Sequence, residues 1–311
     1  MQREEMKFER NPTPEDLVEE EKALSLDEAH WETLLTVMEA KRCTPFLGAG
    51  ASTPPLPRAR ELAKMWSQKY DYPLENQTDL ASVTQYLRIK FGDPFVVKHK
   101  IKTHFRSFPV PDFSRPNQIH GLLADLGLPL YVTTNYDDYL EQALKKKNRH
   151  PVSEVCRWNA WIRKNCKSIF DQTAHPGFEP TDDQPVVFHL HGLIDYPESL
   201  VLTEDDYVDF LGSMDEQLIP ECVQGALSEK SVLFLGYGLS DWNFRVLFRT
   251  VARYLEKSLS PVHVSVQLLP PPPGKKAAVL EYLNKYFGEL AIRVFWGTCQ
   301  QFADELHQRR Q

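Results

Sequence analysis

A polar cluster that directly follows an apolar run has side chains able to hold a sugar or a positioned water molecule. It reads Thr133-Thr134-Asn135-Tyr136-Asp137, which places hydroxyls, an amide and a carboxylate within five residues. Such groups orient ribose hydroxyls or water by hydrogen bonding. A purely local interpretation also accounts for them, because Asn135 or Asp137 could cap the helix that the next residues predict.

The segment "HLHG" holds two histidines, His189 and His191, at the end of another apolar run. On an extended strand, residues two apart point to the same face, so we expect both rings there. A metal site would need further ligands, and no companion set with ligand spacing is present. One ring is expected to be a hydrogen-bonded core histidine. His191, beside Gly192, is the better candidate for chemistry because an ordinary imidazole titrates near neutral pH.

A glycine-rich turn, "GAGAS", follows the first predicted strand. Gly48 and Gly50 would let the backbone approach a ligand closely, and Ser52 could open a helix toward a pyrophosphate. Thr53 stands where a dinucleotide fingerprint has its third glycine, and no lysine makes this a phosphate loop of nucleoside triphosphatases. A plain tight turn therefore remains an alternative.

The last cluster, "LGYGLSD", pairs two further glycines with possible ligand acceptors. Gly236 and Gly238 allow close approach of the backbone, while Ser240 and Asp241 could accept hydrogen bonds from ribose hydroxyls. The alternative is a turn from strand to helix that is capped by Asp241.

The elements that must position these clusters alternate between strands and helices, and the strands are nearly continuous apolar runs. This pattern predicts an α/β fold, a Rossmann-like parallel sheet flanked by helices. Ligands of such sheets bind outside the carboxyl ends of the strands, so all four clusters are expected at one rim. A capping box of Ser25 and Glu28 predicts where the first helix begins.

Composition limits the class of protein. Of the formal net charge of −7, residues 1–30 contribute −6, so the rest is almost neutral and nucleic-acid binding is not expected. No window of about 18 apolar residues predicts a membrane span. The five cysteines are scattered along the chain, which favours a protein of the reducing cytoplasm over one that is held together by disulfide bonds. We expect a flexible acidic arm over 1–24 and one domain over 25–311, with a helical insertion at about 54–118 and an irregular one at about 141–185.

Taken in order, "FLGAGAS", "YVTTNYD", "HG" followed by "SLVLTEDDY", and "GYGLSDWNFRVLF" resemble the sirtuin-like NAD-hydrolase domain of bacterial anti-phage defence systems. The resemblance covers about residues 45–248 and implies a sirtuin-type fold with NAD bound at the rim. It assigns Asn135 and His191 as catalytic. It assigns the following residues to NAD binding: Gly48, Ala49, Gly50, Ser52, Thr134, Asp137, Gly236, Tyr237, Gly238 and Asp241.

Two departures from the protein deacylases of the sirtuin family bear on activity. The stretch "TPPLPRAR" lacks the Asp-Phe pair that covers the nicotinamide pocket of deacylases, and only Cys156 and Cys166 lie between Asn135 and His191, so a four-cysteine zinc ribbon is absent. The resemblance therefore implies an NAD+ glycohydrolase that uses NAD as substrate and needs no metal. A non-catalytic NAD or ADP-ribose binder is the alternative, and a deacylase a weaker one.

The resemblance also implies a biological setting. An enzyme that depletes NAD+ in an infected cell must be restrained, so we expect a homo-oligomer or a partner protein such as a DNA-translocating ATPase.

Overall fold

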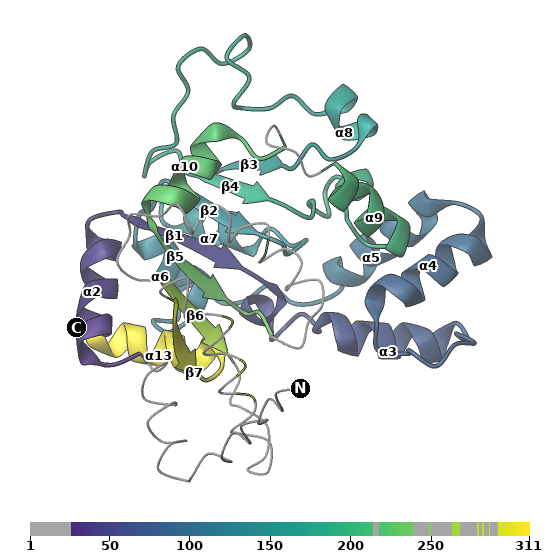
Figure 1. Cartoon of the computed structure of the whole chain (residues 1–311), viewed down its shortest axis with the longest axis horizontal. Helices are drawn as coiled ribbons and strands as arrows, with labels where there is room; N and C mark the ends of the chain where they lie inside the picture. The colour runs from purple at the N-terminus through teal and green to yellow at the C-terminus, as the bar shows by residue number, and fades with distance from the viewer. Residues whose placement is uncertain are drawn as a thin grey trace, which may run out of the picture.

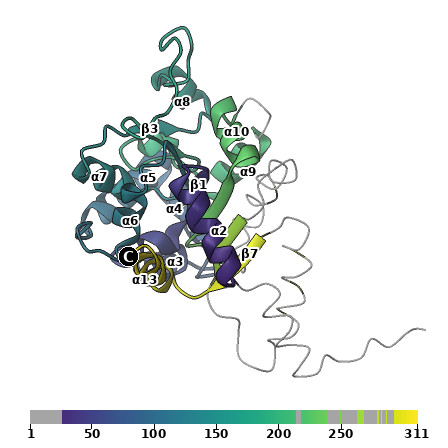
Figure 2. The ribbon, with the colours of Figure 1, turned by 90° about the vertical axis from the view of Figure 1, so that its left-hand side faces the viewer.

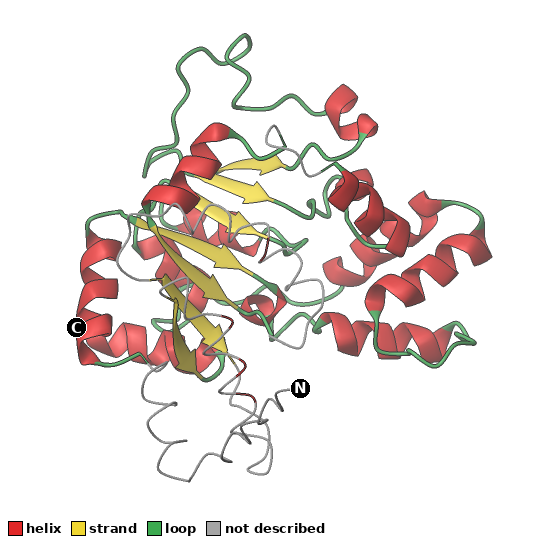
Figure 3. Cartoon of the chain, viewed as in Figure 1, coloured by secondary structure: helices red, strands yellow, loops and turns green. Residues whose placement is uncertain are grey.

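In the computed structural model, seven parallel strands form one sheet in the order β3-β4-β2-β1-β5-β6-β7 (Figures 1 and 3). The structure describes residues 26–213, 218–238, 263–267 and 292–311, and the single residues Arg249, Val279, Tyr282 and Tyr286. The strands are β1 (Cys43–Leu47), β2 (Leu130–Thr133), β3 (Val152–Val155), β4 (Val186–His189), β5 (Ser231–Leu235), β6 (His263–Gln267) and β7 (Ile292–Trp296). The predicted Rossmann-like α/β fold is confirmed.

Helices cover both faces of this sheet, as Figure 2 shows in a view along the strands. The α-helices are α2 (Glu28–Glu39), α3 (Ala59–Lys69), α4 (Leu80–Phe91), α5 (Pro94–Arg106), α6 (Ile119–Asp125), α7 (Tyr139–Lys146), α8 (Ala160–Asn165), α9 (Glu204–Gly212), α10 (Glu221–Glu229) and α13 (Cys299–Arg309). None of these described helices is both long and apolar enough to cross a membrane.

Alternation along each strand divides the apolar side chains between two cores. On β4, Val186 and Phe188 face the core that α10 covers, whereas Val187 faces the core under α2, α6, α7 and α13. Period-two alternation sends neighbouring side chains to opposite faces, so strands buried on both faces read as continuous apolar runs. A third core joins α3, α4 and α5 to Ile194, Leu200 and Leu202. The helical insertion thus packs against the segment that follows β4.

Three local predictions need correction. Asp27 caps α2, accepting a hydrogen bond from the His30 N–H, so the helix does not begin at the predicted Ser25 box. The stretch 141–185 is not wholly irregular, because β3 lies in it and adds an edge strand beside β4. The sequence from Glu204 to Lys230 has a helical pattern that predicts one continuous stretch, but it forms two helices, α9 and α10, and α10 has Pro220 at its N-cap. The predicted arm 1–24 lies outside the described residues. The sequence patterns at 242–257 and 274–288 also predict helices, and they too lie outside the described residues apart from four single positions.

Candidate functional site

The carboxyl ends of four neighbouring strands meet at one rim, as the sequence predicts. Leu47 of β1 pairs with Thr133 of β2 and with Leu235 of β5, and Thr133 pairs with His189 of β4. These are the last residues of their strands, so the four loops that carry the predicted clusters leave the sheet at the same level. Figure 1 shows α3, α4, α5 and α9 facing this rim.

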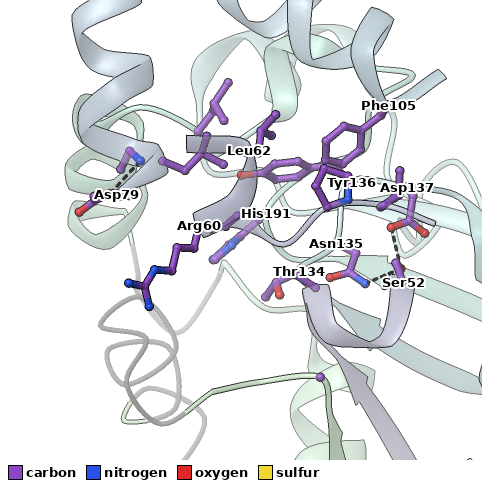
Figure 4. Close-up of a pocket in the computed structure, with 18 of the residues that line it drawn as sticks. Ser52, Arg60, Leu62, Asp79, Phe105, Thr134, Asn135, Tyr136, Asp137 and His191 are labelled. Carbon is purple, nitrogen blue, oxygen red and sulfur yellow. Dashed lines mark hydrogen bonds between the residues drawn. The ribbon is translucent and has the colours of Figure 1, made fainter. Parts of the chain in front are cut away.

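A pocket of about 570 Å³ lies at this rim, between the strand ends and the helical insertion (Figure 4). Its described lining includes eight of the predicted site residues: Ala49, Ser52, Thr134, Asn135, Asp137, His191, Gly236 and Tyr237. Gly48, Gly50 and Gly238 do not line it, and Asp241 lies outside the described residues.

The glycines of two loops allow those loops to pack on each other. A Cβ on Gly50 would come within 2.8 Å of the Gly236 Cα, and one on Gly48 within 2.5 Å of the Tyr237 ring. The Gly50 N–H donates to the Gly236 carbonyl at 2.9 Å, and the Gly48 N–H donates to the Leu235 carbonyl at 2.7 Å. The close approach that these glycines allow is therefore an approach of the two loops to each other, to backbone at Gly50 and to the Tyr237 ring at Gly48. These two N–H groups already have protein acceptors.

Asn135 is held from several sides in one orientation. Its Nδ2 donates to the Gly48 carbonyl and to Ser52 Oγ, both at 3.0 Å, and its backbone N–H donates to Thr133 Oγ1 at 2.9 Å. A carbonyl oxygen can only accept, so the group that faces Gly48 must be the NH2 of the amide. The amide oxygen is consequently left for the pocket that Asn135 lines, pointing away from Ser52 in Figure 4.

Asp137 supports this arrangement from behind. Its Oδ2 accepts from Ser52 Oγ at 2.9 Å, and its Oδ1 accepts from the Tyr139 N–H at 3.2 Å. The N-cap of α7 is Asp138 rather than Asn135 or Asp137, but the Asp137 carboxylate accepts from the first N–H of the helix and also orients the site. Burial raises the pKa of Asp137 to about 6, although the hydrogen bonds from Ser52 and Tyr139 oppose the rise. At neutral pH this buried carboxyl is mostly ionised.

His191 presents a different environment. Its ring packs edge-on against Tyr207, at 5.6 Å between centroids, and against Phe210, at 5.1 Å, both from α9. Burial lowers the pKa of His191 to about 3, so the imidazole is neutral at physiological pH. The expectation that it changes protonation near neutral pH is therefore wrong. A neutral ring can still accept a hydrogen bond from a ligand hydroxyl.

His189 does not share the face of His191. Strand β4 ends at His189, and the chain then turns through Gly192, whose φ is +89°. The His189 ring is fully buried, with Nε2 at 2.6 Å from Glu141 Oε1. It is thus the hydrogen-bonded core histidine that the sequence allows for, and the prediction that both rings point one way fails because the strand is shorter than assumed.

The sequence did not identify the opposite wall of the pocket. That wall comes largely from the helical insertion and from α9, and its members include Leu56, Arg60, Leu62, Asn76, Asp79, Phe105 and Tyr207. Arg60 lies in "TPPLPRAR", directly after the glycine-rich turn, and this position was the signal that could have revealed it. Leu56 lies in the same stretch and Tyr207 ends the motif "SLVLTEDDY", whereas Asn76, Asp79 and Phe105 are distant in sequence from every motif. In the part of the chain that the structure describes, no group of three or more His, Cys, Asp or Glu side chains is arranged to hold a metal ion.

An open parallel sheet with a polar pocket at its switch point defines a protein of the nucleotide-binding α/β class. Residues 129–290 match the SIR2-like domain family, and the chain belongs to that family. This confirms the sirtuin-type fold that the four motifs indicate.

The chain is also similar to curated bacterial proteins. It is 26% identical over 190 residues to the NAD(+) hydrolase ThsA of Enterococcus faecium, covering 60% of this chain and 35% of that protein. It is 26% identical over 230 residues to the NAD(+) hydrolase ThsA of Cytobacillus dafuensis, covering 72% of this chain and 41% of that protein. It is 24% identical over 170 residues to Defense-associated sirtuin 2 of Bacillus subtilis, covering 54% of this chain and 15% of that protein. The chain thus spans well under half the length of these relatives.

Proposed function

We propose that the protein is an NAD+ hydrolase that cleaves the bond between nicotinamide and ribose, giving nicotinamide and ADP-ribose. The observation that carries the proposal is the orientation of Asn135, whose amide oxygen is left for the pocket because its nitrogen is bonded to Gly48 and Ser52. The names of the ThsA relatives support the same reaction.

The reaction needs two things from the protein, namely the positioning of the reactants and the stabilisation of charge in the transition state. Water attacks C1′ of the ribose while the bond to the pyridinium nitrogen breaks, and that nitrogen takes the bond's electron pair and leaves as neutral nicotinamide. The attacking water releases one proton to the solvent, which leaves a hydroxyl on C1′ of ADP-ribose. The transition state resembles an oxocarbenium ion, so it needs a positioned water and stabilised positive charge. In this proposal the Asn135 amide oxygen accepts a hydrogen bond from the water or from a ribose hydroxyl.

The electrostatics of the pocket suit a cationic substrate. Asp137 adds a buried negative charge behind Asn135, and His191 is kept neutral by burial, so it does not repel the nicotinamide ring. We assign His191 the role of an acceptor for a ribose hydroxyl. It is not the base that the sequence suggested, because an imidazole with a pKa of about 3 takes up a proton poorly at neutral pH.

Arg60 is a suitable counter-charge for the pyrophosphate of NAD+. Among the described residues that line the pocket, it is the one lysine or arginine. Figure 4 shows Arg60 and His191 on one side of the view and Ser52 and Asp137 on the other, with Thr134 and Asn135 between them. We therefore place the nicotinamide ribose at Asn135 and the phosphates toward Arg60.

The biological role that we propose is depletion of NAD+ during phage infection, in the manner of an abortive response in the cytoplasm. The Bacillus subtilis relative is named a defence-associated sirtuin. Such an activity requires restraint, and we propose assembly of a homo-oligomer or contact with a partner protein such as a DNA-translocating ATPase. We further propose residues 25–311 as the NAD-binding domain and 1–24 as a flexible acidic arm.

A product assay tests the proposal against its alternatives. Purified protein is incubated with NAD+, with and without an acetylated peptide, and nicotinamide, ADP-ribose and acetylated ADP-ribose are separated by chromatography. We expect nicotinamide and ADP-ribose in equal amounts regardless of the peptide. Release that depends on the peptide would identify a deacylase, and saturable NAD+ binding without any release, under conditions that also drive assembly, would identify a binder.

A further inference from the structure

Behind the pocket, a buried acid and a buried imidazole contact each other and the backbone of Asn135. Glu141 of α7 is 3% exposed and His189 of β4 is 0% exposed, and Oε1 of the acid lies 2.6 Å from Nε2 of the ring. The other ring nitrogen, Nδ1, lies 3.4 Å from the backbone oxygen of Asn135. Neither Glu141 nor His189 lines the pocket, whereas Asn135, whose backbone oxygen the ring contacts, does.

The hydrogen-bond partners fix the charge of this pair. The backbone oxygen of Asn135 can only accept, so Nδ1 carries a hydrogen. Burial acts against ionised Glu141, but the charge of His189 and the hydrogen bonds from His189 and Ser153 hold the pKa of Glu141 below its usual range. Ionised Glu141 can only accept, so Nε2 of the ring, 2.6 Å from Oε1, also carries a hydrogen. The second oxygen, Oε2, is buried with no hydrogen-bond partner among the described residues, and so no acceptor there would receive a carboxylic acid proton. Both ring nitrogens are donors only in an imidazolium, and the pair is therefore His189⁺–Glu141⁻.

The surrounding groups favour the same charge state. Burial acts against the charged ring, but the negative charge of Glu141 and its hydrogen bond outweigh burial and raise the pKa of His189. Asp137 adds a second negative charge that acts in the same direction. Glu141 also lies in the first turn of α7, where the helix dipole favours a negative charge.

We propose that His189 and Glu141 are positioning residues, a charged pair that holds the Asn135 peptide so that the Asn135 amide oxygen stays directed into the pocket. The inference rests on the proposed NAD+ hydrolysis. Asn135 is then held on both sides, with Gly48 and Ser52 on its side chain and His189 on its backbone carbonyl. A small displacement of a group that acts on the transition state lowers kcat with little effect on KM.

Two substitutions of His189 separate positioning from a merely structural role. The amide nitrogen of Asn stands near the place of ring Nδ1, so His189→Asn keeps the donor toward Asn135. The amide nitrogen of Gln stands near the place of ring Nε2, so His189→Gln keeps the contact with Glu141 and loses the one with Asn135. We expect His189→Gln to lower kcat by about 10- to 100-fold at nearly constant KM. His189→Asn keeps the donor toward Asn135 but leaves Glu141 without its counter-charge, so it should lower kcat by a smaller factor.

Several results of this comparison would overturn the proposal. These are equal losses in both variants at equal melting temperatures, wild-type kcat in His189→Gln, or a change confined to KM. If the wild type itself releases no nicotinamide, the proposed function fails and the positioning role fails with it. That outcome is distinguishable because it appears before any variant is made.

A second measurement does not depend on activity or on the folding of a variant. In protein with ¹⁵N-labelled histidine, we expect one imidazolium signal at pH 8, where an ordinary imidazole with a pKa of about 6.5 is neutral. Folded Glu141→Gln protein should lose that signal, and His189→Asn protein should lack it. A His189 ring that is neutral at pH 8 in the wild type would overturn the charged pair.

Discussion

At the scale of single residues, Ser52 connects the two side chains on which the proposed chemistry depends. Its hydroxyl accepts from the Asn135 amide and donates to the Asp137 carboxylate. A hydroxyl can do both at once, which an apolar or acceptor-only side chain cannot. The charge of Asp137 and the orientation of Asn135 are therefore linked through one small residue.

This link predicts how activity depends on pH. Because the folded-state pKa of Asp137 is raised to about 6, its negative charge is present above that pH and is lost as the pH falls through it. Nicotinamide release should decline in the same window. Ser52→Ala removes a hydrogen bond that lowers this pKa, so the midpoint of the decline should move to higher pH in a pH–rate profile.

Ser67→Ala is the matched control, since Ser67 is equally buried at 2% exposure but bonds only the Lys64 carbonyl within α3. It should leave the midpoint unchanged. An identical midpoint in wild type and Ser52→Ala would contradict the assignment of this decline to Asp137. The same raised pKa means that the folded state binds more protons than the unfolded state between about pH 4 and 6, so Asp137 contributes less to stability as the pH rises through that range.

Sequence reasoning located Asn135 and His191 because polar residues at a strand end are a local signal. It misjudged the charge of His191, because that depends on Tyr207 and Phe210, which are distant in sequence. Arg60 was missed as a lining residue for a different reason: it is close in sequence to the glycine-rich turn, but the sequence alone does not show which way its helix, α3, presents it.

At the scale of elements, the loops after β1 and β5 fit together only because small residues meet. Gly236 has a φ of +80°, and a Cβ there would lie 2.3 Å from the Ala51 nitrogen and 2.6 Å from the Gly48 oxygen. Backbone cannot move aside as a flexible side chain can. The geometry of the Asn135 side chain, which bonds the same Gly48 oxygen, therefore depends on this loop contact.

We expect Gly236→Ala to reduce the free energy of unfolding by about 2 kcal/mol or more, because strain at positive φ adds to the clash. Gly225→Ala is the control, since Gly225 lies within α10 and a Cβ there meets nothing within 4 Å. That change should be neutral or stabilising by up to about 1 kcal/mol. Urea unfolding of the two variants measures both values, and equal stabilities would contradict the loop contact.

A buried ion pair joins the helical insertion to the wall that holds His191. Lys98 Nζ of α5 donates to Asp206 Oδ1 of α9 and to the Leu200 carbonyl, each at 2.8 Å. Lys98→Met would leave Asp206 buried and without its counter-charge, and we expect a loss of about 3–5 kcal/mol in the free energy of unfolding. The more exposed pair of Arg88 and Asp205 joins α4 to the same helix, so Arg88→Met should cost less than about 1 kcal/mol. Urea unfolding measures both losses. Similar losses in the two variants would contradict the claim that the buried pair stabilises the fold more than the exposed pair.

Strands with continuous apolar runs could be predicted from the sequence, but β3 could not. Its four residues include Ser153 and Glu154, and it forms the edge of the sheet by pairing with β4 alone. A short edge strand with polar residues has too little pattern to separate it from a loop. The cap of α2 was misplaced by two residues, which is the usual uncertainty where several polar residues precede a helix.

At the scale of the whole molecule, the sheet has a supporting core on each face and a third core in the helical insertion, and the pocket lies between the rim and that insertion. The first contact of the described chain with the sheet is made by the Leu26 N–H, which donates to the Val294 carbonyl of β7 at 3.2 Å. Glu28 of α2 bonds Arg309 of α13, which joins the two ends of the described fold.

These contacts predict that removal of residues 1–24 leaves the domain intact. The truncated protein should keep the melting temperature and the NAD+ affinity of the full chain, because Leu26 and Glu28 are retained. Differential scanning calorimetry and titration with NAD+ measure the two quantities. A drop in melting temperature or in affinity would show that the acidic segment belongs to the domain.

Asn135 is the residue on which the proposed hydrolysis depends most directly. The decisive measurement is the rate of nicotinamide release from NAD+ by wild type, Asn135→Ala and Asn165→Ala, where Asn165 is an exposed asparagine at the end of α8. Loss of the amide oxygen from the pocket should slow release by about 10²- to 10³-fold, since it removes a pre-positioned group from the transition state, and Asn165→Ala should match the wild type. Undiminished release by folded Asn135→Ala protein would mean that the pocket at this rim is not where NAD+ is cleaved.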